Sequence, residues 1–196
     1  MIIGLTGGMG VGKSTIVEIL EEKHNVALVK FAAPLYDMQE FVYRRIANVY
    51  KKPQGFAKDR KLLQWLGTEW GRGSISDTLW VDLWKSEVDL QGKVKYTDFI
   101  ISDDTRFDNE AQAIRDIGGI VIKIVSNQSS SRIDTTSGIF SHSSESGISA
   151  NLVDYVLVNE GSVEDLRNSL ATLLELIYAK NTQRQESLNV QQGVKK

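Results

Sequence analysis

The strongest chemical signal in the sequence is a glycine-rich stretch at residues 7–14, which reads GGMGVGKS. It matches the G-x-x-x-x-G-K-[ST] pattern of a phosphate-binding P-loop. In such a loop the backbone N–H groups surround phosphate oxygens, the lysine reaches the β- and γ-phosphates, and the hydroxyl ligates Mg²⁺. The pattern predicts ATP and Mg²⁺ as cofactors, with Ser14 as a metal ligand. The predicted donor site comprises Gly7, Gly8, Gly10, Val11, Gly12, Lys13, Ser14 and Thr15.

A second set of chemical groups follows an apolar run at residues 99–102. Asp103 and Asp104 end this run, and an acid at that point can hold Mg²⁺ or accept a proton. A helix N-cap is the alternative role. Arg106 can bind a phosphate through two parallel hydrogen bonds, or it can pair with Asp103, Asp104 or Glu110. The predicted catalytic residues are Lys13, Asp103, Asp104 and Arg106, with Asp103 as a second metal ligand.

Strands that alternate with helices must position these groups. The strands are predicted at residues 2–5, 26–31, 99–102, 120–125 and 154–158. The helices are predicted from residue 13 and at residues 34–49, 58–70, 77–90, 107–117 and 163–178. This alternation predicts an α/β fold of three layers, in which helices cover both faces of a five-stranded parallel sheet.

A helical insertion at about residues 44–90 interrupts the alternation. Its stretch 44–72 is rich in Lys and Arg, which is typical either of a solvated helix face or of a surface that attracts anions. Trp80 and Trp84 lie one helical turn apart, which favours a packed helix face over a surface for stacking a base. The insertion is therefore the predicted acceptor-binding region.

A serine-rich stretch at residues 126–149 contains Arg132, His142 and Glu145. Its composition is typical of an exposed excursion between two strands. Two interpretations stay open, a lid that closes over phosphates and an exposed surface loop.

Bulk composition excludes several classes of protein. A chain of 196 residues predicts one domain, at residues 1–179, followed by a polar tail at 180–196. The absence of cysteine excludes disulfides, thiolate catalysis and thiolate-bound metals.

A net charge of −2 argues against a nucleic-acid partner, and no apolar run is long enough to span a membrane. We expect a cytoplasmic enzyme with a small-molecule substrate and no membrane partner; a homodimer stays open.

Beyond the P-loop, five short stretches resemble the bacteriophage deoxynucleoside monophosphate kinase family in the same order. They are residues 31–35 (FAAPL), 63–72 (LQWLGTEWGR), 103–110 (DDTRFDNE), 142–145 (HSSE) and 159–162 (NEGS). The resemblance spans about residues 1–175. It implies ATP-dependent conversion of deoxynucleoside monophosphates to diphosphates on a nucleoside-monophosphate-kinase fold with a lid.

The resemblance also implies roles for individual residues. Asn159 and Gly161 would lie near the adenine of ATP. The acceptor would contact Phe31, Gln64, Trp65, Arg72, Asp104, Arg106 and Glu145. A dephospho-CoA kinase, which shares the P-loop and a similar ending at residues 159–162, is the alternative enzyme, and a nucleotide-binding switch is the alternative outside catalysis.

Overall fold

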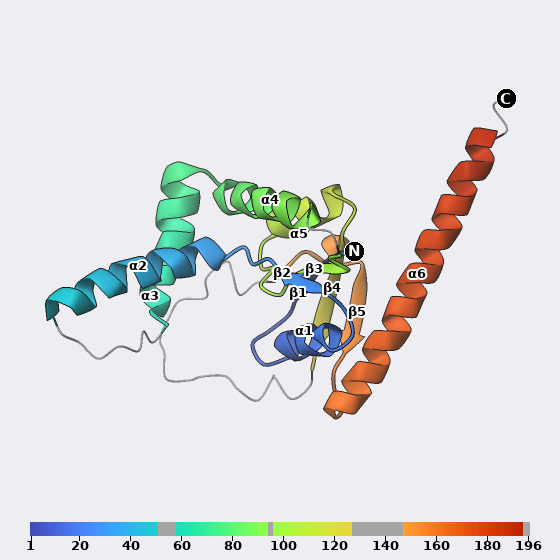
Figure 1. Ribbon diagram of the computed structural model, residues 1–196, viewed down its shortest axis with the longest axis horizontal. Coiled ribbons are helices and arrows are strands. Elements are labelled where there is room, and N and C mark those ends of the chain that lie inside the picture. Colours follow the sequence, from blue (N-terminus) through green and yellow to red (C-terminus); the bar gives the residue numbers. More distant parts are fainter. Residues whose placement is uncertain (51–57, 94–95, 127–146, 194–196) are drawn as a thin grey trace.

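The fold is built on a parallel sheet that lies between helices (Figure 1). The computed structural model describes residues 1–50, 58–93, 96–126 and 147–193, without the side chains of Tyr50 and of residues 184–193. In this part of the chain five parallel strands pair in the order β2-β3-β1-β4-β5. They are β1 (Ile2–Thr6), β2 (Val26–Leu28), β3 (Phe99–Ser102), β4 (Ile120–Val125) and β5 (Tyr155–Val158). The predicted α/β fold with a five-stranded parallel sheet is confirmed.

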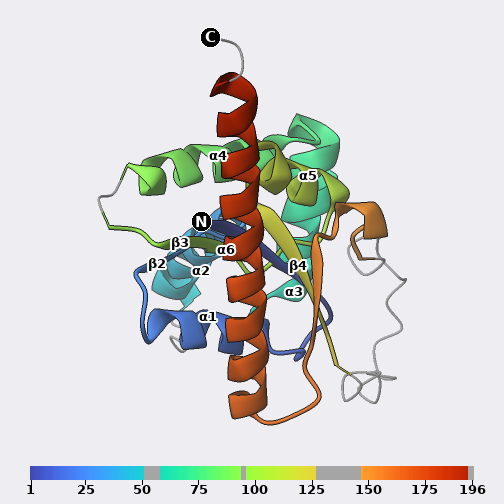
Figure 2. The ribbon, with the colours of Figure 1, turned by 90° about the vertical axis from the view of Figure 1, so that its right-hand side faces the viewer.

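Two helical layers cover the sheet. Helices α1 (Lys13–Glu21) and α6 (Val163–Gly193) pack on one face, and α4 (Leu79–Gly92) and α5 (Asp108–Asp116) pack on the other. Figure 2 shows α6 running across its face of the sheet. All four residues of β3 are buried, because a central strand contacts both layers. This burial explains why the strand reads as an unbroken apolar run.

The helical insertion departs from the predicted single helix over residues 58–70. Helix α3 (Arg60–Trp65) follows α2 (Ala33–Tyr50). Its N-cap is Asp59, whose side chain accepts a hydrogen bond from the Leu62 N–H. The chain then continues as a π-helix, η1 (Leu66–Ile75). Glycine has little preference for the α-helix, and the Trp80 indole N–H donates to the Gly67 carbonyl at 2.8 Å. Both features favour the wider helix.

The ends of two other elements differ from the sequence pattern. Strand β2 ends at Leu28 instead of continuing to Phe31, because the Val29 carbonyl accepts hydrogen bonds from the side chains of Ser102 and Trp84. Helix α6 continues to Gly193, beyond the predicted end at Tyr178. A helix needs no apolar face where it does not pack, and glutamine, glutamate and arginine are good helix formers. None of the described helices is long and apolar enough to cross a membrane.

The packing of Trp80 against η1 gives a test of this region. A Cβ atom at Gly71 would lie 2.3 Å from the Trp80 ring. We expect Gly71→Ala to lower the free energy of unfolding by about 1–3 kcal/mol, because the buried indole must move. Gly73→Ala is the matched control, since its Cβ would meet nothing closer than the Thr68 carbonyl at 3.5 Å. Urea denaturation of both variants checks this, and equal midpoints would contradict the packing.

Candidate active site

The P-loop connects β1 to α1 and requires glycine at two of its positions for steric reasons. Gly7 and Gly12 have φ angles of 138° and 104°, which side chains with a Cβ rarely adopt. A Cβ at Gly7 would lie 2.4 Å from the Ile124 carbonyl, and one at Gly12 would lie 2.6 Å from Asn159 Nδ2. The loop is therefore packed tightly between β4 and the end of β5.

Lys13 lies over this loop. Its amino group donates hydrogen bonds to the Gly7 and Gly8 carbonyls at 2.8 and 2.7 Å. Burial lowers the pKa of Lys13, and the positive charge of Arg106 lowers it further, whereas Asp103 and Asp104 act in the opposite direction. Arg106, Asp103 and Asp104 therefore lie within electrostatic range of Lys13, and we call these four predicted catalytic residues at the carboxyl edge of the sheet the cluster.

The hydroxyl residues of the predicted donor site open α1, next to Lys13. Ser14 is exposed and Thr15 is half-buried. The Ser14 hydroxyl is thus accessible to a metal ion or a phosphate.

Asp103 is buried and has one unsatisfied oxygen. Its Oδ2 accepts a hydrogen bond from the Lys30 amino group at 3.0 Å, whereas its Oδ1 has no partner among the described residues. A buried carboxylate oxygen without a donor is costly unless a cation or water binds it. No group of three or more His, Cys, Asp or Glu side chains in the described ranges is arranged to hold a metal ion by itself. A Mg²⁺ ion would suit this site, because it takes one or two carboxylates together with water and phosphate oxygens.

Asp104 has a different role in the structure. Its two oxygens accept hydrogen bonds from the backbone N–H groups of Phe31, at 3.1 Å, and Ala32, at 2.9 Å. Burial raises the pKa of Asp104, although these two hydrogen bonds oppose the shift. Helix α5 begins at Asp108, so neither acid caps it. Asp104 therefore fixes the connection between β2 and α2 beside the cluster.

Arg106 presents an exposed guanidinium. Its side chain is exposed, and none of the ion pairs considered for it, with Asp103, Asp104 or Glu110, is present in the described structure. Its backbone N–H donates to Glu110 Oε2 at 2.8 Å, which holds the residue in place. Arg106 is thus positioned by its backbone and available to an anion through its side chain.

Arg72, in contrast, is occupied by the protein. Its Nη2 lies 2.6 Å from Glu110 Oε1, its Nη1 donates to the Asp77 carbonyl at 3.1 Å, and its guanidinium carbon lies 3.9 Å from the centre of the Phe107 ring. Only 15% of its side chain is exposed. Arg72 ties η1 to α5, and its predicted contact with the acceptor stays a prediction.

The other predicted acceptor residues lie in different environments. Phe31 is 3% exposed and stacks on Trp84, with ring centroids 4.7 Å apart. Gln64 is half-buried and Trp65 is 51% exposed, both on α3. Glu145 lies outside the described residues, as do Arg132, His142 and most of the predicted lid at 126–149.

The two residues predicted near adenine follow β5. Asn159 Nδ2 donates to the Val11 carbonyl at 2.9 Å, which links β5 to the P-loop. A Cβ at Gly161 would lie 2.4 Å from Asp165 Oδ2, and that oxygen accepts a hydrogen bond from the Ser162 N–H at 2.8 Å. The tight turn at Gly161 leads into α6. The contact of Asn159 and Gly161 with adenine stays a prediction.

Two residues in this site were not singled out by sequence reasoning as functional. Lys30 lies near the end of the second predicted strand, at residues 26–31, and contacts Asp103. Glu110 accepts hydrogen bonds from both Arg72 and the backbone of Arg106. The signal for Lys30 was a charged residue at the end of an apolar strand, the same signal that identified Asp103.

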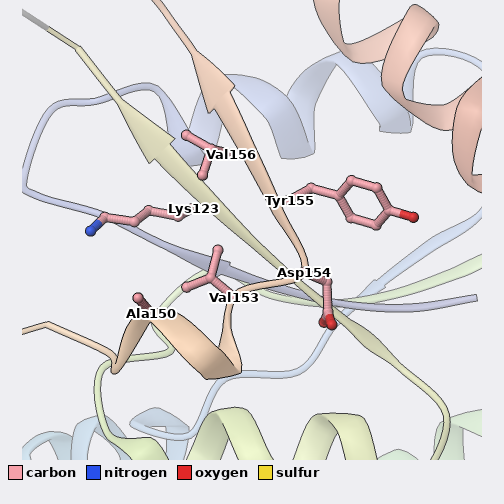
Figure 3. Close-up of a pocket in the computed structure, with 6 residues that line it drawn as sticks. All are labelled: Lys123, Ala150, Val153, Asp154, Tyr155 and Val156. Atoms are coloured by element: carbon pink, nitrogen blue, oxygen red, sulfur yellow. The ribbon is translucent and has the colours of Figure 1, made fainter.

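A separate hollow of about 240 Å³ lies beside β4 and β5 (Figure 3). Its lining residues are Lys123, Ala150, Val153, Asp154, Tyr155 and Val156. Figure 3 shows the Tyr155 ring pointing away from Lys123. The hollow gathers none of the predicted catalytic side chains, so the cluster at the carboxyl edge is the candidate active site.

Comparisons with known proteins identify the family of this chain. The family model described as deoxynucleotide monophosphate kinase matches residues 46–170. A protein of Acanthamoeba polyphaga mimivirus, named as a deoxynucleotide monophosphate kinase, is 28% identical over 89% of this chain and 96% of its own length. The deoxynucleotide monophosphate kinase of Enterobacteria phage T4 is 29% identical over 69% of this chain, which spans 53% of that protein.

A solved structure supports the fold alone. The Thermus thermophilus protein TT1252 superimposes with a TM-score of 0.50 at 16% identity, covering 89% of this chain and 96% of that one.

Glu110 gives a pH-dependent test of the site. Burial raises its pKa from 4.5 to about 7, against the opposing effect of Arg72. The folded protein therefore binds more protons than the unfolded chain between these two values, and the contribution of Glu110 to stability falls as the pH rises. We expect the free energy of unfolding of wild type, relative to Glu110→Gln, to fall by roughly 1 kcal/mol per pH unit between pH 5 and 7.

Denaturation with urea at several pH values measures this difference. Glu175→Gln is the control, because Glu175 is exposed on α6. A constant difference between wild type and Glu110→Gln over this pH range would show that the carboxylate stays ionised in the folded protein.

Proposed function

Because this chain belongs to the deoxynucleotide monophosphate kinase family, we propose that it transfers the γ-phosphoryl group of ATP to a deoxynucleoside monophosphate. The products would be a deoxynucleoside diphosphate and ADP. The observation that carries this proposal is the P-loop with Lys13 over its carbonyls, next to a buried Asp103 oxygen at the end of the neighbouring strand β3 that has no partner among the described residues. We propose the cytoplasm as the place of reaction, where these small nucleotides are found.

The proposed reaction is an in-line displacement. An oxygen of the acceptor phosphate forms a bond to the γ-phosphorus while the bond from that phosphorus to the β,γ-bridging oxygen breaks, and ADP leaves with the electron pair. A phosphate monoester has its second pKa near 6, so the attacking oxygen is already ionised near neutral pH. The protein therefore needs no strong general base, and its task is to align the two anions and neutralise their charge.

Each residue of the cluster has a proposed part in that task. Lys13 exchanges its hydrogen bonds to the Gly7 and Gly8 carbonyls for donor phosphate oxygens. Arg106 binds the acceptor or transferring phosphate through its free guanidinium. Asp103 Oδ1 and the Ser14 hydroxyl would hold Mg²⁺, which would supply positive charge to the phosphates.

The first test of this function is a coupled assay of ADP release with Mg-ATP and a panel of acceptors. The panel contains dAMP, dGMP, dCMP, dTMP, their ribose counterparts and dephospho-CoA. We expect strong stimulation by one or more deoxynucleotides over ATP alone. A response to dephospho-CoA only would assign a different kinase reaction, and silence on all acceptors would favour a nucleotide-binding switch.

A substitution of the P-loop lysine tests the mechanism. We expect Lys13→Ala to lower kcat by at least about 100-fold, because it removes a preorganised charge from the transition state. Lys23→Ala is the matched control, since Lys23 is exposed just beyond the end of the same helix. Thermal unfolding should be similar for both variants, and near-normal turnover of Lys13→Ala would contradict the assignment.

A further inference from the structure

We propose that Lys30 binds the phosphate group of the acceptor nucleotide, as the cationic partner of Arg106. This inference rests on the proposed function and adds a specific acceptor-binding residue to it. Lys30 lies between β2 and α2, with its amino group 3.0 Å from Asp103 Oδ2. It is thus placed beside the candidate metal-binding oxygen and in contact with the cluster that contains Lys13.

The backbone on both sides of Lys30 is fixed to the end of β3. On one side, the Val29 carbonyl accepts a hydrogen bond from the Ser102 hydroxyl at 2.7 Å, and the Val29 N–H donates to the Ile101 carbonyl at 2.8 Å. On the other side, the Phe31 N–H donates to Asp104. A side chain on such a fixed backbone loses less conformational entropy on binding than one on a free loop.

The Lys30 amino group has N–H donors that make no hydrogen bond in the described structure. An ammonium carries three N–H donors, and in the described structure Lys30 makes one hydrogen bond, to Asp103. Its side chain is 35% exposed. The remaining donors suit the oxygens of a phosphate group, for which lysine acts as a compact point charge.

The acceptor phosphate also needs a second cation that Arg72 does not offer. The Arg72 guanidinium is bound to Glu110, the Asp77 carbonyl and the face of Phe107, and only 15% of its side chain is exposed. Releasing it would leave Glu110 Oε1 buried without the hydrogen bond that Arg72 donates, which is unfavourable. Lys30 can bind a phosphate without such a loss, because its partner Asp103 can hold Mg²⁺ instead.

The test is steady-state kinetics of Lys30→Met with the best deoxynucleotide from the acceptor panel. We expect the KM for the acceptor to rise about 10-fold to 100-fold, as for the loss of a hydrogen bond to a charged group. The KM for Mg-ATP should stay near the wild-type value, and Lys30→Arg, which keeps the charge, should recover most of the acceptor affinity. Lys93→Met is the matched control, because Lys93 is exposed at the end of α4.

Three results would overturn the inference. The first is an acceptor KM for Lys30→Met equal to that of Lys93→Met. The second is a rise in the KM for Mg-ATP instead of the acceptor, which would assign Lys30 to the donor. The third is a loss of thermal stability with both KM values unchanged, which would make the Lys30–Asp103 pair purely structural.

Calorimetric titration with deoxynucleoside monophosphates in the absence of ATP separates this inference from the proposed function. Weaker binding by Lys30→Met than by wild type supports the inference even if no turnover is found. Equal binding by both proteins would overturn the inference about Lys30. Turnover by the wild type would in that case still support the proposed kinase function. Absence of both binding and turnover in the wild type would overturn both.

Discussion

Two adjacent carboxylates at the end of β3 hold the candidate site together. Asp103 accepts a hydrogen bond from Lys30, and Asp104 accepts the N–H groups of Phe31 and Ala32. A carboxylate that is removed from water must find donors or a cation, so this pair draws in the chain that follows β2. Both carboxylates also lie close enough to Lys13 to oppose the lowering of its pKa by burial. The end of one central strand thereby links the P-loop to the segment between β2 and α2.

The ion pair of Arg72 with Glu110 extends this organisation to the helical insertion. It joins η1 to α5 across 38 positions of sequence, and Glu110 also accepts the N–H groups of Arg106 and Phe107. A buried ion pair contributes little net stability compared with apolar packing. It does, however, specify one arrangement of its partners, because breaking it leaves a charge buried without a counter-ion. The position of Arg106 therefore depends on a pair that does not itself touch the P-loop.

The sequence predicted the sheet and the P-loop well because both depend on local patterns. An apolar run stopped by glycines identified β1, an apolar run that ends in Asp103 identified β3, and the motif at residues 7–14 carries its own chemistry. Sequence did not predict the π-helix η1, because it depends on Trp80, which comes later in the chain and occupies the space beside Gly71. The partners of Arg72 were equally inaccessible, because no local spacing connects it to Glu110. Phe31 was assigned to the acceptor by resemblance, and its stacking on Trp84 required the three-dimensional contact.

What this site can bind depends on which of its cationic side chains are already paired within the protein. Arg72 is committed to Glu110 and serves the protein, while Arg106 has an exposed guanidinium and Lys30 keeps donors beyond its bond to Asp103. Transfer between two polyanions requires positive charge that is already in place when the phosphates arrive. A free cation on a mobile segment would lose much of its binding energy to ordering. Here the backbone at Arg106 and next to Lys30 is held by hydrogen bonds to Glu110 and Asp104, so acidic side chains can strengthen the anion-binding site that we propose.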